Sequence, residues 1–294
     1  MLVAAPPFDL IMSSGFLCFS SHCGMLRALE ATGREPDAYV GSSSGALAAA
    51  MAAAGLNADE VARELGGQRP ISLCRPGRPS RSGIVSTRAL VRKLRDVLPP
   101  TFEQLSKPCA VGVYRCNPRS DMSEAYVDPG PLLVTSGDLP LAVAASCAVP
   151  GLFRPLPLIG QAISCGSTLD LPGVAATATL GRPELIDLQT LPADETYFYA
   201  DGGAVDRTAY RGWRAWRPGR ESLVHLVSNK RYGEYGPRDG LGTASDPLPN
   251  VVGVARTPRA RANFFSLRDF DAQVEAAAEA ATEGLARIGW DTPL

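Results

Sequence analysis

The stretch Val40-Gly41-Ser42-Ser43-Ser44-Gly45-Ala46 decides the fold. It fits the pattern G-x-S-x-G and stands between a short apolar run, Ala38 to Val40, and an alanine-rich run, Ala46 to Ala54. A strand, a sharp turn and a helix in this order expose the central serine above a sheet edge, and the glycines Gly41 and Gly45 leave room for the turn. Ser43 is therefore a candidate nucleophile. The alternative interpretation is a glycine–serine loop that caps an ordinary helix.

Strands alternate with helices along the rest of the chain. Apolar runs predict strands at Phe8–Met12, Ala38–Val40, Cys109–Tyr114, Glu124–Val127, Tyr197–Tyr199 and Leu223–Val227. Helical spacing predicts helices at Ser21–Ala31, Ala46–Ala54, Asn57 or Asp59 to Leu65, Thr87–Val97, Leu139–Cys147 and Asp269–Ile288. Residues 66–83 and an insertion at about 159–193 are expected to be irregular. This alternation predicts an α/β protein whose parallel sheet is covered on both faces.

Composition excludes several classes of protein. The chain has 294 residues, with 29 basic and 30 acidic side chains, so nothing suggests a nucleic-acid partner. Seven cysteines without a C-x-x-C pair, and only two histidines, leave little for a structural metal site and favour a reduced, cytoplasmic protein. The most apolar run is half a membrane span, so any membrane contact would be peripheral.

A serine hydroxyl needs a general base before it becomes a good nucleophile. Histidine is the usual base, but only His22 and His225 exist. Asp201-Gly202-Gly203 offers another, because it follows a predicted strand and its two glycines free the aspartate to point along the top of the sheet. Partial desolvation would make that carboxylate a better proton acceptor. Taken alone, the tripeptide is more typical of a tight turn.

Four arginines lie in the proline-rich stretch between Gly66 and Gly83, at positions Arg69, Arg75, Arg78 and Arg81. Two interpretations stay open. The first is a solvated, positively charged loop. The second is a patch that contacts anionic lipid headgroups.

Three separated motifs together resemble the patatin-like phospholipase family. They are the Ser43 turn, the block from Ala144 to Pro155 (A-A-S-C-A-V-P-G-L-F-R-P), and Asp201-Gly202-Gly203. The resemblance implies a three-layer α/β/α sandwich with a mostly parallel central sheet, and a Ser43–Asp201 dyad that works without histidine. It also implies a catalytic domain over residues 8–208, with the 159–193 insertion as a candidate lid. Residues 209–294 would form an extension, a strand plus a terminal helix, packed on the same domain.

The opening loop departs from the family's G-G-G-x-R-G pattern. Here the stretch runs from Ser13 to Phe19, and only Gly15 remains of the glycines. Because backbone N–H groups form an oxyanion hole, Gly15, Phe16 and Ser44 are still candidate donors. Phe16 and Phe19 bring Cβ atoms where the family has glycine.

The resemblance implies hydrolysis of lipid carboxylic esters through an acyl-enzyme, without metal or organic cofactor. Phospholipid, galactolipid and glyceride stay open as substrates, and the sequence does not address the oligomeric state. One alternative is an α/β-hydrolase with a Ser43–Asp201–His225 triad, since these residues follow that fold's chain order. Another is a lipid-binding pseudoenzyme, motivated by the altered opening loop.

Overall fold

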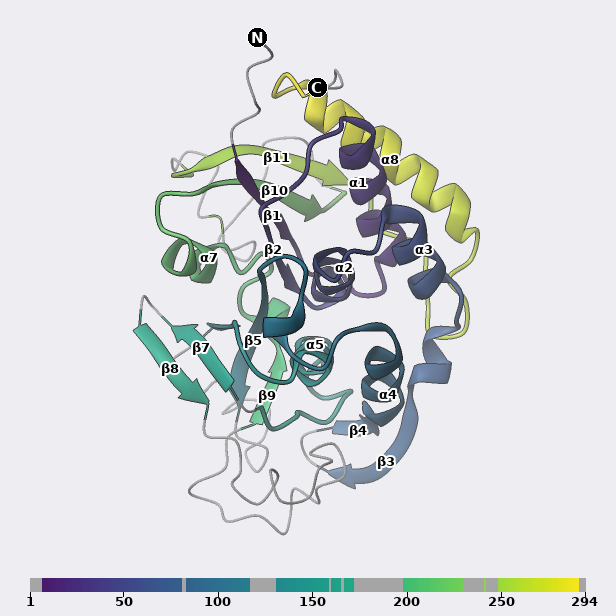
Figure 1. Cartoon of the computed structure of the whole chain (residues 1–294). Helices are drawn as coiled ribbons and strands as arrows, with labels where there is room; N and C mark the ends of the chain where they lie inside the picture. The colour runs from purple at the N-terminus through teal and green to yellow at the C-terminus, as the bar shows by residue number, and fades with distance from the viewer. Residues whose placement is uncertain are drawn as a thin grey trace.

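The structure, a computed structural model, describes residues 7–80, 83–116, 131–158, 160–164, 167–171, 198–229, 241 and 248–290. Its main strands are β1 (Phe8–Met12), β2 (Ala38–Ser42), β5 (Cys109–Cys116), β6 (Pro131–Val134), β7 (Gly160–Ser164), β8 (Ser167–Leu171), β9 (Phe198–Asp201), β10 (Glu221–Val227) and β11 (Val251–Thr257). They form one nine-stranded sheet in the order β11-β10-β1-β2-β5-β6-β7-β8, with β9 paired to β5 off this path (Figure 1).

The sheet is mostly parallel, as predicted. The five neighbours from β11 to β5 all run in the same direction, and antiparallel pairs then add β6, β7, β8 and β9. Because β7 is antiparallel to β6, it points the same way as β5, so six of the nine strands share one direction. The turn that contains Ser43 follows β2, in the parallel part of the sheet.

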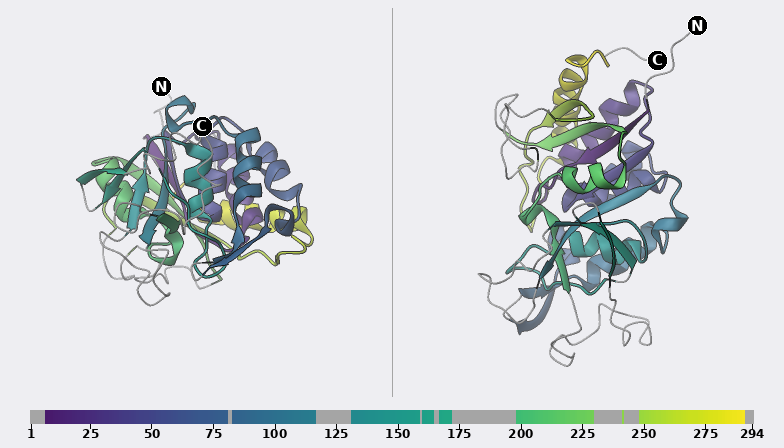
Figure 2. Two further views of the ribbon diagram at one scale, coloured as in Figure 1. Left: turned by 90° about the horizontal axis from the view of Figure 1, so that it is seen from below. Right: turned by 90° about the vertical axis from the view of Figure 1, so that its left-hand side faces the viewer.

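Helices cover both faces and make three layers (Figures 1 and 2). The described α-helices are α1 (Phe19–Ala31), α2 (Ser44–Ala53), α3 (Ala58–Gly66), α4 (Arg88–Val97), α5 (Leu139–Ser146), α7 (Tyr210–Trp216) and α8 (Phe270–Ala286). Along β1, Phe8, Leu10 and Met12 join the core beneath the larger group of helices. Ile11 faces the opposite way and packs with Trp213 of α7. This period of two is what a strand between two apolar layers requires.

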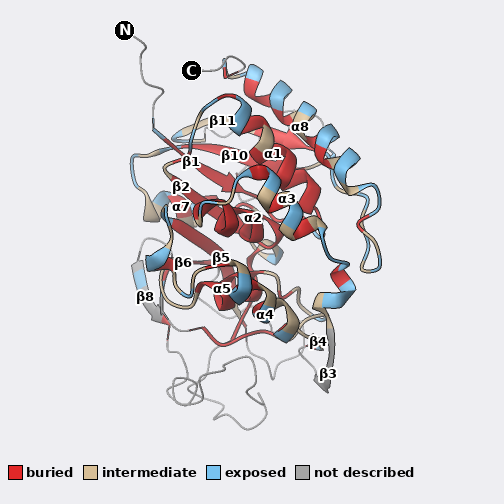
Figure 3. Ribbon diagram, turned by 45° about the vertical axis from the view of Figure 1, so that its right-hand side comes forward, coloured by how far each residue is buried: buried red, intermediate tan, exposed pale blue. Residues whose placement is uncertain are grey.

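The helices on the larger face are closely fitted to one another and to the sheet. Every residue of α2 is buried, which explains its alanine-rich sequence (Figure 3). At Gly24 of α1, a Cβ atom would lie 2.5 Å from Cβ of Ala277 in α8, so a glycine is needed for this approach. Helix α3 begins with a capping box in which Asn57 and Glu60 satisfy each other's backbone N–H groups.

Two expectations for irregular structure are wrong. Residues 66–83 include a short helix, η1 (Pro70–Leu73), and β3 (Arg75–Ser80), which pairs with β4 (Gly83–Ser86) as a small antiparallel sheet. The 159–193 insertion begins with the β7–β8 hairpin, which extends the central sheet. Strands β6 and β11 and helix α7 were not predicted. The predicted strand at 124–127 and the rest of the insertion lie outside the described residues.

Within the described part of the chain, no helix combines the length and the apolar character needed to cross a membrane.

Candidate active site

Ser43 sits at a strained turn between β2 and α2. Its backbone has φ 55° and ψ −122°, a conformation that non-glycine residues rarely adopt. Both motif glycines are required sterically, because a Cβ at Gly41 would lie 2.3 Å from the Gly45 carbonyl oxygen, and one at Gly45 would lie 2.3 Å from the Met12 carbonyl oxygen. The G-x-S-x-G pattern therefore forms the predicted elbow, with Ser43 at its apex.

Strand topology brings Asp201 to this turn. Both β2 and β6 pair with Val111 and Gly112 of β5, so they occupy opposite edges of β5. Likewise β6 and β9 both pair with Val113 and Tyr114, so β9 lies on the same edge as β2. The two strands run toward each other along that edge, and their last residues face Gly112 and Val113. Asp201, at the end of β9, therefore meets Ser43, which follows the end of β2.

The two side chains are hydrogen bonded. Ser43 Oγ donates to Asp201 Oδ2 at 2.8 Å, and the Gly203 N–H donates to Asp201 Oδ1 at 2.8 Å. Burial raises the pKa of Asp201 to about 7, although these two hydrogen bonds oppose the shift. A Cβ at Gly203 would lie 2.3 Å from Ser14 Cβ, and one at Gly202 would meet the Gly112 backbone at 2.5 Å. Side chains larger than glycine are therefore excluded at positions 202 and 203 by these close contacts.

The end of α5 holds the turn from the other side. The Ser43 N–H donates to Ser146 Oγ at 2.8 Å, and Ser146 Oγ donates to the Gly112 carbonyl at 2.6 Å. The Cys147 thiol donates to the Ser43 carbonyl at 3.4 Å. Burial, and then the charge of Asp201, raises the pKa of the Cys147 thiol well above its ordinary value. Ser146 and Cys147 belong to the Ala144–Pro155 block, but no sequence signal gave them a role.

The three candidate oxyanion donors lie beside Ser43. Gly15 opens a turn in which the Cys18 N–H donates to its carbonyl at 3.0 Å, and Leu17 has φ 55°. Ser44 Oγ also donates to the Gly15 carbonyl, at 2.5 Å, which joins this turn to the start of α2. In the described part of the chain, the N–H groups of Gly15, Phe16 and Ser44 have no acceptor. They are available to a ligand.

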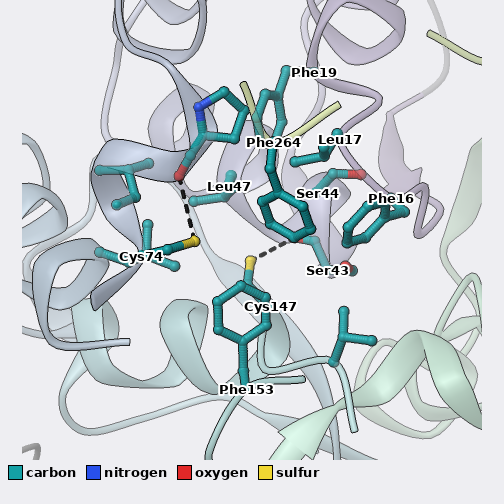
Figure 4. Close-up of a pocket in the computed structure, with 14 residues that line it drawn as sticks. Phe16, Leu17, Phe19, Ser43, Ser44, Leu47, Cys74, Cys147, Phe153 and Phe264 are labelled. Atoms are coloured by element: carbon teal, nitrogen blue, oxygen red, sulfur yellow. Dashed lines mark hydrogen bonds between the residues drawn. The ribbon is translucent and has the colours of Figure 1, made fainter. Parts of the chain in front are cut away.

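An apolar cavity of about 70 Å³ opens next to Ser43 (Figure 4). Apart from Ser43 and Ser44, its lining is hydrocarbon, aromatic or thiol: Phe16, Leu17, Phe19, Leu47, Pro70, Leu73, Cys74, Leu90, Cys147, Val149, Phe153 and Phe264. Figure 4 shows the rings of Phe16, Phe153 and Phe264 around the Ser43 side chain. Hydrocarbon bound in this open cavity would contact apolar side chains, with Ser43 at one edge of the contact.

The sequence model of one protein family, described as patatin-like phospholipase, matches residues 10–211. The chain belongs to the patatin-like phospholipase family. The match includes the Ser43 turn, the end of α5 and Asp201. The family acts on lipid substrates, and lipid hydrolysis is its general activity.

Two solved structures are similar to this patatin-like chain. VipD from Legionella pneumophila shares 14% sequence identity at a TM-score of 0.49, with 97% of this chain and 67% of that chain covered. The type III effector protein ExoU shares 14% identity at a TM-score of 0.42, with 96% of this chain and 53% of that chain covered. This chain thus spans about half the length of ExoU.

Neither histidine of this patatin-like chain is hydrogen bonded to the Ser43 hydroxyl or the Asp201 carboxylate in the described residues. His225 is buried in β10, where one ring nitrogen contacts Thr257 Oγ1 at 2.8 Å and the other contacts His22 Nδ1 at 3.1 Å. Both nitrogens are occupied, so the geometry does not support a Ser43–Asp201–His225 triad. In the described residues, no three His, Cys, Asp or Glu side chains gather as metal ligands.

Proposed function

We propose that this protein is a serine-dependent lipid acyl hydrolase that uses Ser43 as nucleophile and Asp201 as general base. One observation carries the proposal: the 2.8 Å hydrogen bond from Ser43 Oγ to a buried carboxylate, at the end of an apolar cavity. A base within hydrogen-bond reach of the proton that it removes is the first requirement of general-base catalysis.

In the first step, Ser43 Oγ attacks the ester carbonyl carbon while Asp201 accepts the hydroxyl proton. The carbonyl oxygen becomes an oxyanion, which the N–H groups of Gly15, Phe16 and Ser44 stabilise together with the positive end of α2. The C–O bond to the alcohol breaks, and the departing alkoxide takes the proton back from Asp201. An acyl group remains on Ser43.

In the second step, water attacks the acyl carbon and gives its proton to Asp201. Collapse of the oxyanion breaks the bond to Ser43 Oγ, which takes the proton back from Asp201, and the fatty acid leaves. A carboxyl whose pKa is about 7 suits this cycle, because it accepts and returns a proton near neutral pH. Neither step uses a metal or an organic cofactor.

The shape of the site supports a lipid as acyl donor. The cavity lining fits a hydrocarbon chain, which phospholipids, galactolipids and glycerides share, so the cavity does not choose among these classes. We infer further that the catalytic unit spans residues 8–208. Residues 209–294 supply β10, β11 and α8, which join the sheet beside β1 and pack against α1.

A panel of phospholipid, galactolipid and glyceride substrates tests the proposal. We expect fatty acid release from at least one class, and a loss of roughly four to six orders of magnitude in Ser43→Ala. Ser106→Ala is the matched control, because its hydroxyl bonds only to the carbonyl of Ala54, at the opposite end of α2 from Ser43. A folded protein that hydrolyses no lipid ester and does not react with a fluorophosphonate would instead be a lipid-binding pseudoenzyme.

A further inference from the structure

The exposed large hydrophobic side chains gather at the mouth of the apolar cavity. In the described residues there are four: Phe16 (45% exposed), Ile71 (41%), Ile84 (55%) and Phe265 (71%). Scattered exposed hydrophobics are normal, but a group around one opening marks an interaction site.

The three chain segments that carry Phe16, Ile71 and Phe265 contact one another. Phe16 lines the cavity, and its ring lies 5.3 Å from that of Phe264, edge to face. The Ile71 N–H donates to the Phe264 carbonyl at 2.7 Å, which fixes η1 against the loop before α8. Phe265 follows Phe264 directly. Figure 1 shows that loop alongside the segment between α3 and β3.

The fourth residue, Ile84, is hydrogen bonded to another segment that lines the cavity. The Ile84 N–H donates to the Leu152 carbonyl at 3.1 Å, and Phe153, the next residue, lines the cavity. The Phe153 ring lies 6.4 Å from that of Phe264. Of the four exposed hydrophobics, Phe16 lines the cavity, and the other three are adjacent in the chain, or hydrogen bonded, to segments that line it.

Two of these segments, those that carry Ile71 and Phe265, are positively charged. Residues 258–269 carry three exposed arginines, Arg259, Arg261 and Arg268, against one aspartate, and Arg69 is exposed two residues before Ile71. Arginines beside exposed aromatic and aliphatic side chains match the chemistry of an anionic lipid surface, with headgroups outside and hydrocarbon within.

We propose that this rim, made of Phe16, Ile71, Ile84 and Phe265 with the neighbouring arginines, docks the protein on anionic lipid bilayers. The inference rests on the proposed function, because the cavity that the rim surrounds would receive the acyl chain directly from the bilayer. A lipid ester would then pass from the membrane to Ser43 without crossing water.

Vesicle sedimentation of the Ser43→Ala protein tests docking, because this protein does not hydrolyse the lipid. A failure to bind vesicles is therefore distinguished from a failure to hydrolyse lipid esters, which is measured in the substrate panel. Vesicles of phosphatidylcholine, with and without phosphatidylglycerol, serve as probes. Phe265→Ser combined with Ile71→Ser should weaken binding roughly tenfold or more, from the loss of two inserted side chains. Binding should be stronger to the anionic vesicles and weaken with salt.

Ala286→Ser is the matched control, because it makes an exposed apolar residue polar at the opposite end of α8, roughly 24 Å along the helix. Unchanged vesicle binding in the Phe265→Ser, Ile71→Ser protein would overturn the proposal. So would a concentration-dependent dimer in solution that the same double substitution dissociates, because the rim would then bind a second copy of the chain.

A second inference concerns a chain of buried hydrogen bonds that ends at the oxyanion turn. Thr257 Oγ1 lies 2.8 Å from His225 Nε2, the two Nδ1 atoms of His225 and His22 are 3.1 Å apart, and His22 Nε2 lies 3.0 Å from Ser44 Oγ. Ser44 Oγ then donates to the Gly15 carbonyl at 2.5 Å. Thr257, His225, His22 and Ser44 are all buried.

Counting protons fixes the direction of every bond. The Ser44 hydroxyl gives its only proton to the Gly15 carbonyl, so it must accept from His22 Nε2–H. A neutral His22 then has a bare Nδ1, which accepts from His225 Nδ1–H. His225 Nε2 is left as the acceptor of the Thr257 hydroxyl. Burial lowers the pKa of His22 to about 3 and also lowers that of His225, so both rings are neutral.

We infer that His22 and His225 are positioning residues for the oxyanion turn. The Gly15 carbonyl and the Phe16 N–H belong to one planar peptide group and point in opposite directions. A carbonyl held by Ser44 therefore fixes the direction of the Phe16 N–H, one of the donors that the proposed mechanism requires. Neither histidine touches the reacting atoms.

Nitrogen-15 NMR of histidine-labelled protein tests the chain without any activity, and the chain contains only two histidines. We expect His22 protonated at Nε2 and His225 at Nδ1, with neither ring titrating down to about pH 5. Identical tautomers, or titration of either ring near its ordinary pKa, would overturn the inference.

Kinetics supply the second arm. His22→Leu should lower kcat roughly tenfold with KM little changed, far less than the loss in Ser43→Ala, because it disturbs an N–H direction used mainly in the transition state. His22→Gln, whose amide can still donate to Ser44 Oγ, should recover most of that loss. An unchanged kcat in a folded His22→Leu protein would contradict a positioning role.

Discussion

Asp201→Asn should abolish hydrolysis and at the same time stabilise the fold. The ordinary pKa of an aspartate is 3.8, and burial raises that of Asp201 to about 7. Between these two pH values, Asp201 is ionised in the unfolded chain but keeps its proton in the folded protein. The free energy of unfolding of the wild type therefore falls as pH rises, and levels off above about pH 7. At about 1.4 kcal/mol per pH unit, this window amounts to about 4 kcal/mol.

The asparagine variant lacks this titration. The difference between its free energy of unfolding and that of the wild type, measured by urea denaturation, should increase from about pH 4 to pH 7 and stay constant above pH 7. Wild-type kcat/KM on a soluble ester should rise over the same range and be about a tenth of its plateau at pH 6, because only the carboxylate accepts the Ser43 proton. An active variant, or a stability difference that does not grow with pH, would refute this reasoning.

Three further substitutions probe the supports of the site. Gly15→Val should lower kcat by roughly 10²–10³-fold on active-site-titrated enzyme, because a Cβ there meets Cys18 Cβ at 3.0 Å and disturbs a donor N–H; full turnover would remove this turn from the mechanism. Ser146→Ala leaves the Ser43 N–H and the Gly112 carbonyl without their partner, so thermal melting and kcat should both fall, with about 1–3 kcal/mol lost in stability. Asn57→Ala should cost about 1 kcal/mol through the cap of α3, with unchanged activity per folded molecule; an activity loss would mean that α3 reaches the site.

The local elements near the site follow from sequence patterns. Phe8–Met12 is a strand over the predicted residues, and the elbow at Ser43 forms where the glycines require it. These features could be predicted because they depend on residues that are close together in the sequence: an apolar run for the strand, and two glycines for the turn. The Asp201-Gly202-Gly203 turn is a weaker signal, because only the pairing of β9 to the β2 edge of β5 shows that it meets Ser43.

The missed elements depend on partners that lie far away in the sequence. Strand β11 contains Gly253, which weakens the apolar pattern that predicts a strand. The glycine is needed because a Cβ there would lie 2.6 Å from Ile288 Cγ2, in a residue far away in the sequence. Helix α7 has seven residues and begins after Ala209 in a left-handed conformation, without a side-chain cap. Strand β3 contains two prolines and a glycine, which disfavour a strand until β4 pairs with it.

Labelling with a fluorophosphonate, followed by mapping of the modified peptide, tests the central claim most directly. We expect one adduct per molecule, on Ser43, formed by the wild type and absent from both Ser43→Ala and Asp201→Asn. The rate of labelling should rise with pH through about 7, as Asp201 ionises. A folded wild-type protein that does not react, an adduct on another residue such as Cys147, or undiminished labelling in Asp201→Asn would contradict the Ser43–Asp201 mechanism.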